Sequence, residues 1–123
     1  MIRRPLLTTA ALLLSGLPAQ AADSISLPNA VLQGLDKVTA RVERIETPVG
    51  RKLTFGALEV VVRACRKSPP EDPPEKAAFL EIWELKSGEA AVSLFKGWMF
   101  ASSPALSALE HPVYDVWVLD CKP

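Results

Sequence analysis

Residues 97–121 read GWMFASSPALSALEHPVYDVWVLDC, and this stretch decides how the chain folds. It holds two of the three tryptophans, the single tyrosine, the single histidine and one of the two cysteines. Residues 113–121 alternate in the way that a strand requires, and strict alternation places Cys121 on the same face as Trp117. Ser103 as an N-cap and Pro104 as the first helical residue predict a short helical turn before this strand.

Alternating apolar segments continue upstream. Residues 38–42 alternate valine and alanine with polar residues, which predicts a half-buried strand. Residues 53–65 predict another strand with a bend at Gly56. Strict alternation puts Cys65 of this strand on the face opposite its shared aliphatic face, which consists of Leu58, Val60, Val62 and Ala64.

Residues 77–86 are compatible with a helix or a strand, and we favour a strand that forms a hairpin with the segment that follows. Residues 77–86 and 91–101 are both rich in apolar and aromatic side chains, and Ser87-Gly88 between them is typical of a turn. The returning strand would bring Trp98, Met99 and Phe100 into the core. Together these patterns predict an all-β fold, a small β-sandwich or partly open barrel of about five to six strands with one short helical turn.

The N-terminal residues 1–21 have the features of a secretory signal peptide. Arg3 and Arg4 precede an apolar run over residues 6–14, which is shorter than the about 20 residues that span a bilayer. Ala19-Gln20-Ala21 then forms a cleavage site with small residues. We therefore expect a periplasmic protein with no membrane span after cleavage, a leader over residues 22–36 and a single β domain over residues 37–123.

The charge balance excludes two classes of partner. Cleavage after Ala21 leaves 12 basic and 14 acidic residues, a formal charge of −2. A nucleic-acid partner would favour a basic patch, and so would electrostatic docking to a membrane. We expect neither.

Cys65 and Cys121 form an even, widely separated pair in a chain that we expect to be exported, which predicts a structural disulfide. A redox or metal-binding pair is the alternative, but such pairs are usually close in sequence. Between the two cysteines lies RKSPPEDPPEK, residues 66–76. Its four prolines predict a stiff, exposed connection, and a binding role for its Pro-Pro steps is a second interpretation.

The sequence offers one arrangement for catalysis, a hydrolase that uses Ser102 or Ser103 with His111 and Asp115. An extended chain separates His111 from Asp115 by roughly 13 Å, whereas a catalytic base and its orienting carboxylate must be in hydrogen-bond contact. A nucleophile elbow of the Gly-x-Ser-x-Gly type is absent from the sequence. A metal site would need His111 with neighbouring carboxylates, and one histidine makes a weak ligand set. We expect no metal and no cofactor.

Tryptophans are enriched at protein interfaces, but all three in this chain lie in apolar segments. We therefore expect at least two in the core, with Trp83 as the exposed one. His111 and Tyr114 have no evident structural role in the sequence. Trp83, His111 and Tyr114 are accordingly the predicted binding patch.

Four segments together resemble the DUF2155 family of secreted, mainly alphaproteobacterial proteins: LDKVTARV (residues 35–42), FGALEVVVRAC (55–65), PPEDPPEKAAFLEIWE (69–84) and residues 97–121. The resemblance implies a single exported domain and supplies no catalytic residues. It also suggests a partner in the envelope or the respiratory chain. The resulting interpretation is a non-enzymatic β domain that binds or scaffolds another envelope component, with the small periplasmic hydrolase as the alternative.

Overall fold

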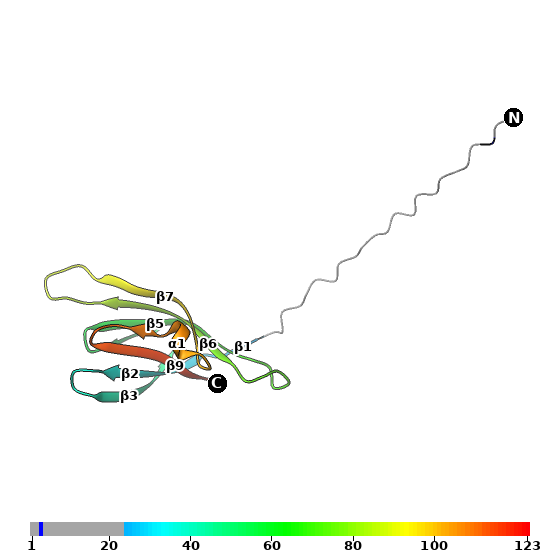
Figure 1. The fold of residues 1–123 in the computed structure, drawn as a ribbon, viewed down its shortest axis with the longest axis horizontal. Coiled ribbons are helices and arrows are strands. Elements are labelled where there is room, and N and C mark those ends of the chain that lie inside the picture. Colours follow the sequence, from blue (N-terminus) through cyan, green and yellow to red (C-terminus); the bar gives the residue numbers. More distant parts are fainter. Residues whose placement is uncertain (1–2, 4–23) are drawn as a thin grey trace.

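The chain folds as a two-layered β-sandwich, shown as a ribbon in Figure 1. The computed structural model describes residue 3 and residues 24–123, so the expected signal peptide over residues 1–21 lies outside the described residues except for Arg3. Sheet A has the order β1-β5-β6-β7, and β4 also pairs with β5. Its strands are β1 (Ile25–Ser26), β4 (Lys52–Phe55), β5 (Leu58–Lys67), β6 (Lys76–Glu84) and β7 (Val92–Phe100).

Sheet B has the order β3-β2-β9-β8, and all strand pairs in both sheets are antiparallel. Its strands are β2 (Asn29–Asp36), β3 (Arg41–Pro48), β8 (Leu109–Glu110) and β9 (Tyr114–Lys122). The two antiparallel sheets confirm the predicted all-β fold. The sheets do not close into a barrel, which favours the sandwich over the barrel. The described residues form nine strands, more than the sequence predicted, because β2 and several short strands join the sheets.

The core lies between the two sheets and is made of aliphatic side chains. Leu58, Val60 and Val62 of β5 face inward, as the alternation predicts, and are almost fully buried. They pack against residues from the neighbouring strands and from sheet B, including Leu32, Leu80, Ile82, Met99, Val116 and Val118. Complete burial of each such side chain stabilises the fold by about 1.5–3 kcal/mol.

Strand β2 corrects the expected leader. The predicted leader includes residues 29–36, but β2 lies in the middle of sheet B, between β3 and β9. Its residues Ala30, Val31 and Leu32 are fully or almost fully buried. The apolar run before Gly34 therefore belongs to the folded domain, which begins upstream of residue 37.

The alternation at residues 38–42 does not mark a half-buried strand. Residues 37–40 form the turn between β2 and β3, and Ala40 there has a positive φ of 58°. Val38 is 77% exposed, and Val42 at the start of β3 is also exposed. Strand β3 is an edge strand, so its side chains have fewer neighbours than a central strand provides.

Two β-bulges direct the cysteines into the core. The pairing of β5 with β6 shifts by one residue at Arg63, and the pairing of β9 with β2 shifts at Leu119. Each bulge reverses the alternation beyond it. Cys65 and Cys121 are therefore both buried and form the predicted disulfide, which joins sheet A to sheet B across a Cα–Cα distance of 5.7 Å.

The bend predicted at Gly56 is the turn between β4 and β5. Gly56 has a φ of 56°, in the left-handed region that favours glycine. A Cβ at this position would also lie 2.6 Å from the ring of Tyr114. Only glycine accommodates both the left-handed backbone and the close approach of the ring, because Tyr114 of sheet B packs directly on this turn of sheet A.

The predicted helical turn is α1 (Pro104–Ser107), with Pro104 as its first residue and Ser103 at the N-cap position. The Ser103 side chain makes no capping hydrogen bond, contrary to the role expected for it. The neighbouring Ser102 side chain bonds Glu75 instead.

Candidate functional site

His111 is held in one tautomer by two hydrogen bonds. The backbone N–H of Val113 donates to Nδ1 at 3.0 Å, so we assign the ring proton to Nε2. Nε2 lies 3.2 Å from Oε2 of Glu84 and donates to it. The imidazole thus connects the β8–β9 turn of sheet B to the end of β6 in sheet A.

Tyr114 makes a second connection between the sheets. Its ring stacks on His111 with centroids 5.6 Å apart and meets Phe55 edge-on at 5.7 Å. Its hydroxyl accepts a hydrogen bond from the N–H of Ala57 at 3.2 Å. These contacts give His111 and Tyr114 structural roles that the sequence did not reveal.

The third member of the predicted patch lies elsewhere. Trp83 is opposite Ser93 in the β6–β7 pairing, on the face of β6 that also carries Phe79 and Glu81. Glu84, which binds His111, is on the other face because side chains alternate along a strand. The structure therefore brings His111 and Tyr114 together and places Trp83 on the opposite side of sheet A.

The contacts of Asp115, His111 and Ser102 assemble no nucleophile and base within the described residues. Asp115 pairs with Lys37, whose Nζ lies 2.8 Å from Oδ1 and also donates to the carbonyl of His111 at 2.8 Å. Ser102 bonds Glu75, while His111 bonds Glu84. The described part of the chain also holds no group of three or more His, Cys, Asp or Glu residues placed to bind a metal ion.

The outer face of sheet A carries exposed aromatic side chains. Trp98 and Phe100 of β7 are 38% and 41% exposed, whereas Met99 between them is buried. The ring of Trp98 meets Phe79 edge-on with centroids 5.6 Å apart. The expectation that Trp98 and Phe100 lie in the core is therefore wrong, and Trp98, not Trp83, is the tryptophan among the exposed large hydrophobic residues.

A cavity of about 490 Å³ adjoins these aromatic residues. Trp98 and Phe100 line it on the β7 side, and Ala77 of β6 lies between them and β5. Pro69 and Pro73 contribute apolar surface from the proline-rich loop, and the remaining lining residues are Ser24, Arg66, Lys67, Ser68, Asp72 and Glu75. The loop thus forms one wall of an apolar recess beside β7.

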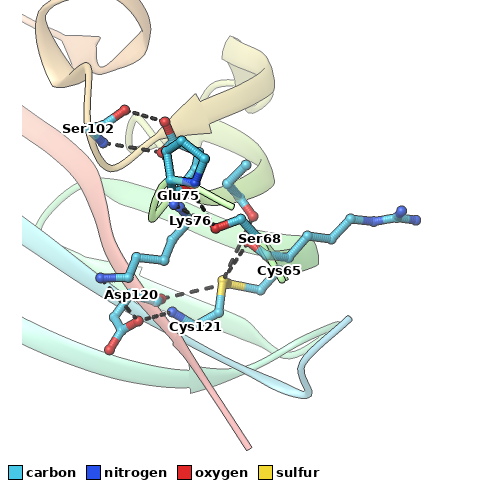
Figure 2. A network of polar contacts seen from close by, with 10 residues as sticks. Cys65, Ser68, Glu75, Lys76, Ser102, Asp120 and Cys121 are labelled. Carbon is cyan, nitrogen blue, oxygen red and sulfur yellow. Dashed lines mark hydrogen bonds and ion pairs between the residues drawn. A yellow bond between two sulfur atoms is a disulfide. The ribbon is translucent and has the colours of Figure 1, made fainter. Parts of the chain in front are cut away.

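Glu75 fastens this loop to the chain that follows β7, as Figure 2 shows. The Ser102 hydroxyl donates to Oε2 of Glu75, and the N–H groups of Ser102 and Lys76 donate to Oε1 at 3.3 and 3.0 Å. Ser68 closes the base of the loop, because its hydroxyl accepts from the Glu75 N–H at 2.9 Å and donates to the Pro73 carbonyl at 3.0 Å. The hydrogen bond from Ser102 is the main cause that lowers the pKa of Glu75.

We expect Glu75→Gln to destabilise the domain by about 1 kcal/mol at pH 7, the typical contribution of one hydrogen bond. Because its pKa is lowered below 4.5, the Glu75 carboxylate stabilises the fold fully above pH 4.5 and loses this effect as the pH falls through the folded-state pKa. Urea unfolding at pH 7 and pH 3 should show the difference between wild type and variant shrinking in acid. Glu71→Gln, at an exposed loop position, is the control and should change the free energy of unfolding little at either pH. An equal effect of Glu75→Gln at pH 7 and pH 3 would contradict the stabilising role of the Glu75 carboxylate.

The two long edge strands differ in chemistry. Strand β7 ends sheet A and β3 ends sheet B in the described part of the chain. Strand β3 reads RVERIETP, with four charged residues and a terminal proline. Charged residues and proline on an edge strand prevent its pairing with other chains. Strand β7 reads VSLFKGWMF, with Lys96 as its single charged residue. Strand β7 therefore lacks the protection that β3 has.

A charged cluster lies beside the aromatic residues on the same face. Glu81 of β6 is 3.0 Å from Nη2 of Arg63 and 3.6 Å from Nζ of Lys96. The hydrogen bond from Arg63 is the largest cause lowering the pKa of Glu81. One carboxylate thus serves two cations, and Lys96 is the one on the edge strand.

The sequence does contain a signal for the aromatic edge. Trp98 and Phe100 are two residues apart, so a strand places them on one face and Met99 on the other. Both faces are apolar, and alternation alone does not say which one is covered by a second sheet.

Comparison with known proteins places the chain in a family. A family model described as "Uncharacterized protein conserved in bacteria (DUF2155)" matches residues 30–121. An uncharacterized protein of Rickettsia prowazekii (strain Madrid E) is 33% identical over 93 residues, which are 76% of this chain and 60% of that relative. The match thus spans less than two thirds of the relative's length, and no solved structure matches the chain. Because the family model covers the sandwich from β2 to Cys121, the chain belongs to the DUF2155 family.

Proposed function

We propose that this domain is an exported, non-enzymatic binding module that docks another protein of the cell envelope. Its docking surface is the open edge of β7 with the neighbouring outer face of sheet A. The exposure of Trp98 and Phe100 on an edge strand carries this proposal. Aromatic residues are enriched where proteins bind one another, and an open apolar edge favours the addition of another strand.

The contrast with β3 supports the choice of this edge. The charged residues of β3 are exposed, as is Pro48 at its end. Strand β7 instead combines exposed Val92, Trp98 and Phe100 with the apolar cavity beyond them. An exposed apolar surface of this kind lowers the solubility of the protein unless a partner covers it.

Export is supported by two features. A disulfide between sheets persists in oxidising compartments such as the periplasm. The N-terminal residues have the charge, apolar run and small residues of a signal peptide. Among the described residues, no helix is long and apolar enough to cross a membrane.

Photo-crosslinking in cells tests the docking surface. We place benzoylphenylalanine at Ser93, an exposed position on β7, and as a control at Arg44, an exposed position on β3. We expect a discrete protein adduct from position 93 and little from position 44. Trp98→Ala should reduce the adduct at position 93 severalfold, because it removes an aromatic contact at the interface.

The matched control is Val42→Ala, which truncates an exposed apolar side chain on the opposite edge strand. It should leave the adduct at position 93 unchanged. Equal adduct yields from positions 93 and 44, or an adduct insensitive to Trp98→Ala, would contradict the proposed surface.

A further inference from the structure

We infer that the partner contributes an extended strand that pairs antiparallel with β7. This strand carries an acidic residue opposite Lys96 and apolar residues opposite Trp98 and Phe100. Read from its N-terminus, its pattern is apolar-x-apolar-x-acidic. The inference rests on the proposed function and specifies the chemistry of the segment that docks.

The spacing follows from the geometry of β7. Lys96, Trp98 and Phe100 oppose Glu81, Phe79 and Ala77 of β6, so all three lie on the outer face of sheet A. Residues of an added strand that share this face recur at every second position. The three partner side chains must therefore be two residues apart, in the reverse order of their neighbours on β7.

The acidic residue follows from the charges near the edge. Lys96 has a side chain that is 67% exposed, and its one ion pair among the described residues is with Glu81 at 3.6 Å. Glu81 is closer to Arg63, at 3.0 Å, so this cluster holds an excess positive charge. A carboxylate on the added strand opposite Lys96 balances that charge, and opposite charges in such cross-strand pairs are stabilising.

The same charge disfavours a second copy of this chain as the partner. Strand β7 contains no acidic residue, so another β7 cannot supply the carboxylate. A symmetric antiparallel pairing of the full strands would place Lys96 directly opposite Lys96 of the other copy. Like charges in that position are destabilising.

A charge-exchange experiment with peptides tests the inference. Two blocked peptides of about eleven residues differ only at the acidic position of the pattern, which is glutamate in one and lysine in the other. Fluorescence anisotropy measures their binding to the full domain. We expect the glutamate peptide to bind wild type about fivefold more tightly, and Lys96→Glu to reverse this preference. Lys96→Gln should show little preference, and Arg44→Glu on β3 should keep the wild-type preference.

The outcomes separate this inference from the proposed function. Equal binding of both peptides to wild type, with Trp98→Ala weakening both, would overturn the acidic partner residue and leave the docking surface in place. No binding of either peptide, together with no adduct from position 93, would overturn both proposals. Self-association in sedimentation experiments that Lys96→Gln strengthens, because it removes the repulsion between the two Lys96 side chains, would show that a second copy occupies the edge, which also overturns the inference.

Discussion

Replacing Cys65 and Cys121 together by alanine should lower the free energy of unfolding by about 4 kcal/mol. The two cysteines are 56 residues apart, and the loop they close restricts the unfolded chain. The bond also joins β5 to β9 across the interior, where both residues are buried. The domain has a small core, so this effect is a large fraction of its total stability.

Thermal unfolding measures this effect directly. For a domain of this size, a loss of about 4 kcal/mol lowers the unfolding midpoint by about 20 °C. A reducing agent should lower the midpoint of wild type and leave that of the double variant unchanged. A midpoint within a few degrees of wild type would contradict the structural role of the bond.

Gly56→Ala should destabilise the domain by about 3 kcal/mol. Two causes add at this position: a left-handed backbone costs an alanine about 1 kcal/mol, and the new methyl group overpacks against the Tyr114 ring, which costs about 2 kcal/mol more. Displacement of Tyr114 would also disturb its contacts with His111 and Phe55.

Gly88→Ala provides the matched control. Gly88 has a positive φ of 76°, but a Cβ there would meet no atom within 4 Å. This variant should lose only the backbone contribution of about 1 kcal/mol. Urea unfolding of both variants separates the two causes, and equal losses would show that packing against Tyr114 contributes nothing.

Much of the fold follows from local patterns in the sequence. The β6–β7 hairpin, the bend at Gly56 and the turn that begins at Pro104 each have a local signal in the sequence, and the structure contains all three. The cysteine pairing was also predictable, because a chain with two cysteines has one possible intramolecular bond. These features depend on neighbouring residues or on composition.

The differences between the predicted and the observed fold come from long-range packing. The bulges at Arg63 and Leu119 arise where strands from distant parts of the chain pair, and strict alternation therefore predicts the wrong face for both cysteines. The expected leader over residues 22–36 is wrong at residues 29–36 for the same reason, because these residues form β2, which lies between its neighbours β3 and β9.

The candidate site is harder to predict than the fold. The sequence shows no local role for His111 and Tyr114, because their contacts lie on Glu84, Ala57 and Phe55 of the other sheet. The apolar neighbours of Trp98 predict a position in the core. Its exposure depends on the place of β7 at the sheet edge, which the sequence alone does not specify.

The central claim is that β7 is the docking edge of this domain, and crosslinking from position 93 in cells tests it most directly. We predict one discrete protein adduct from position 93 on β7, reduced severalfold by Trp98→Ala, and little adduct from position 44 on β3. An adduct of equal yield from both edge strands, or no adduct from position 93, would contradict the claim.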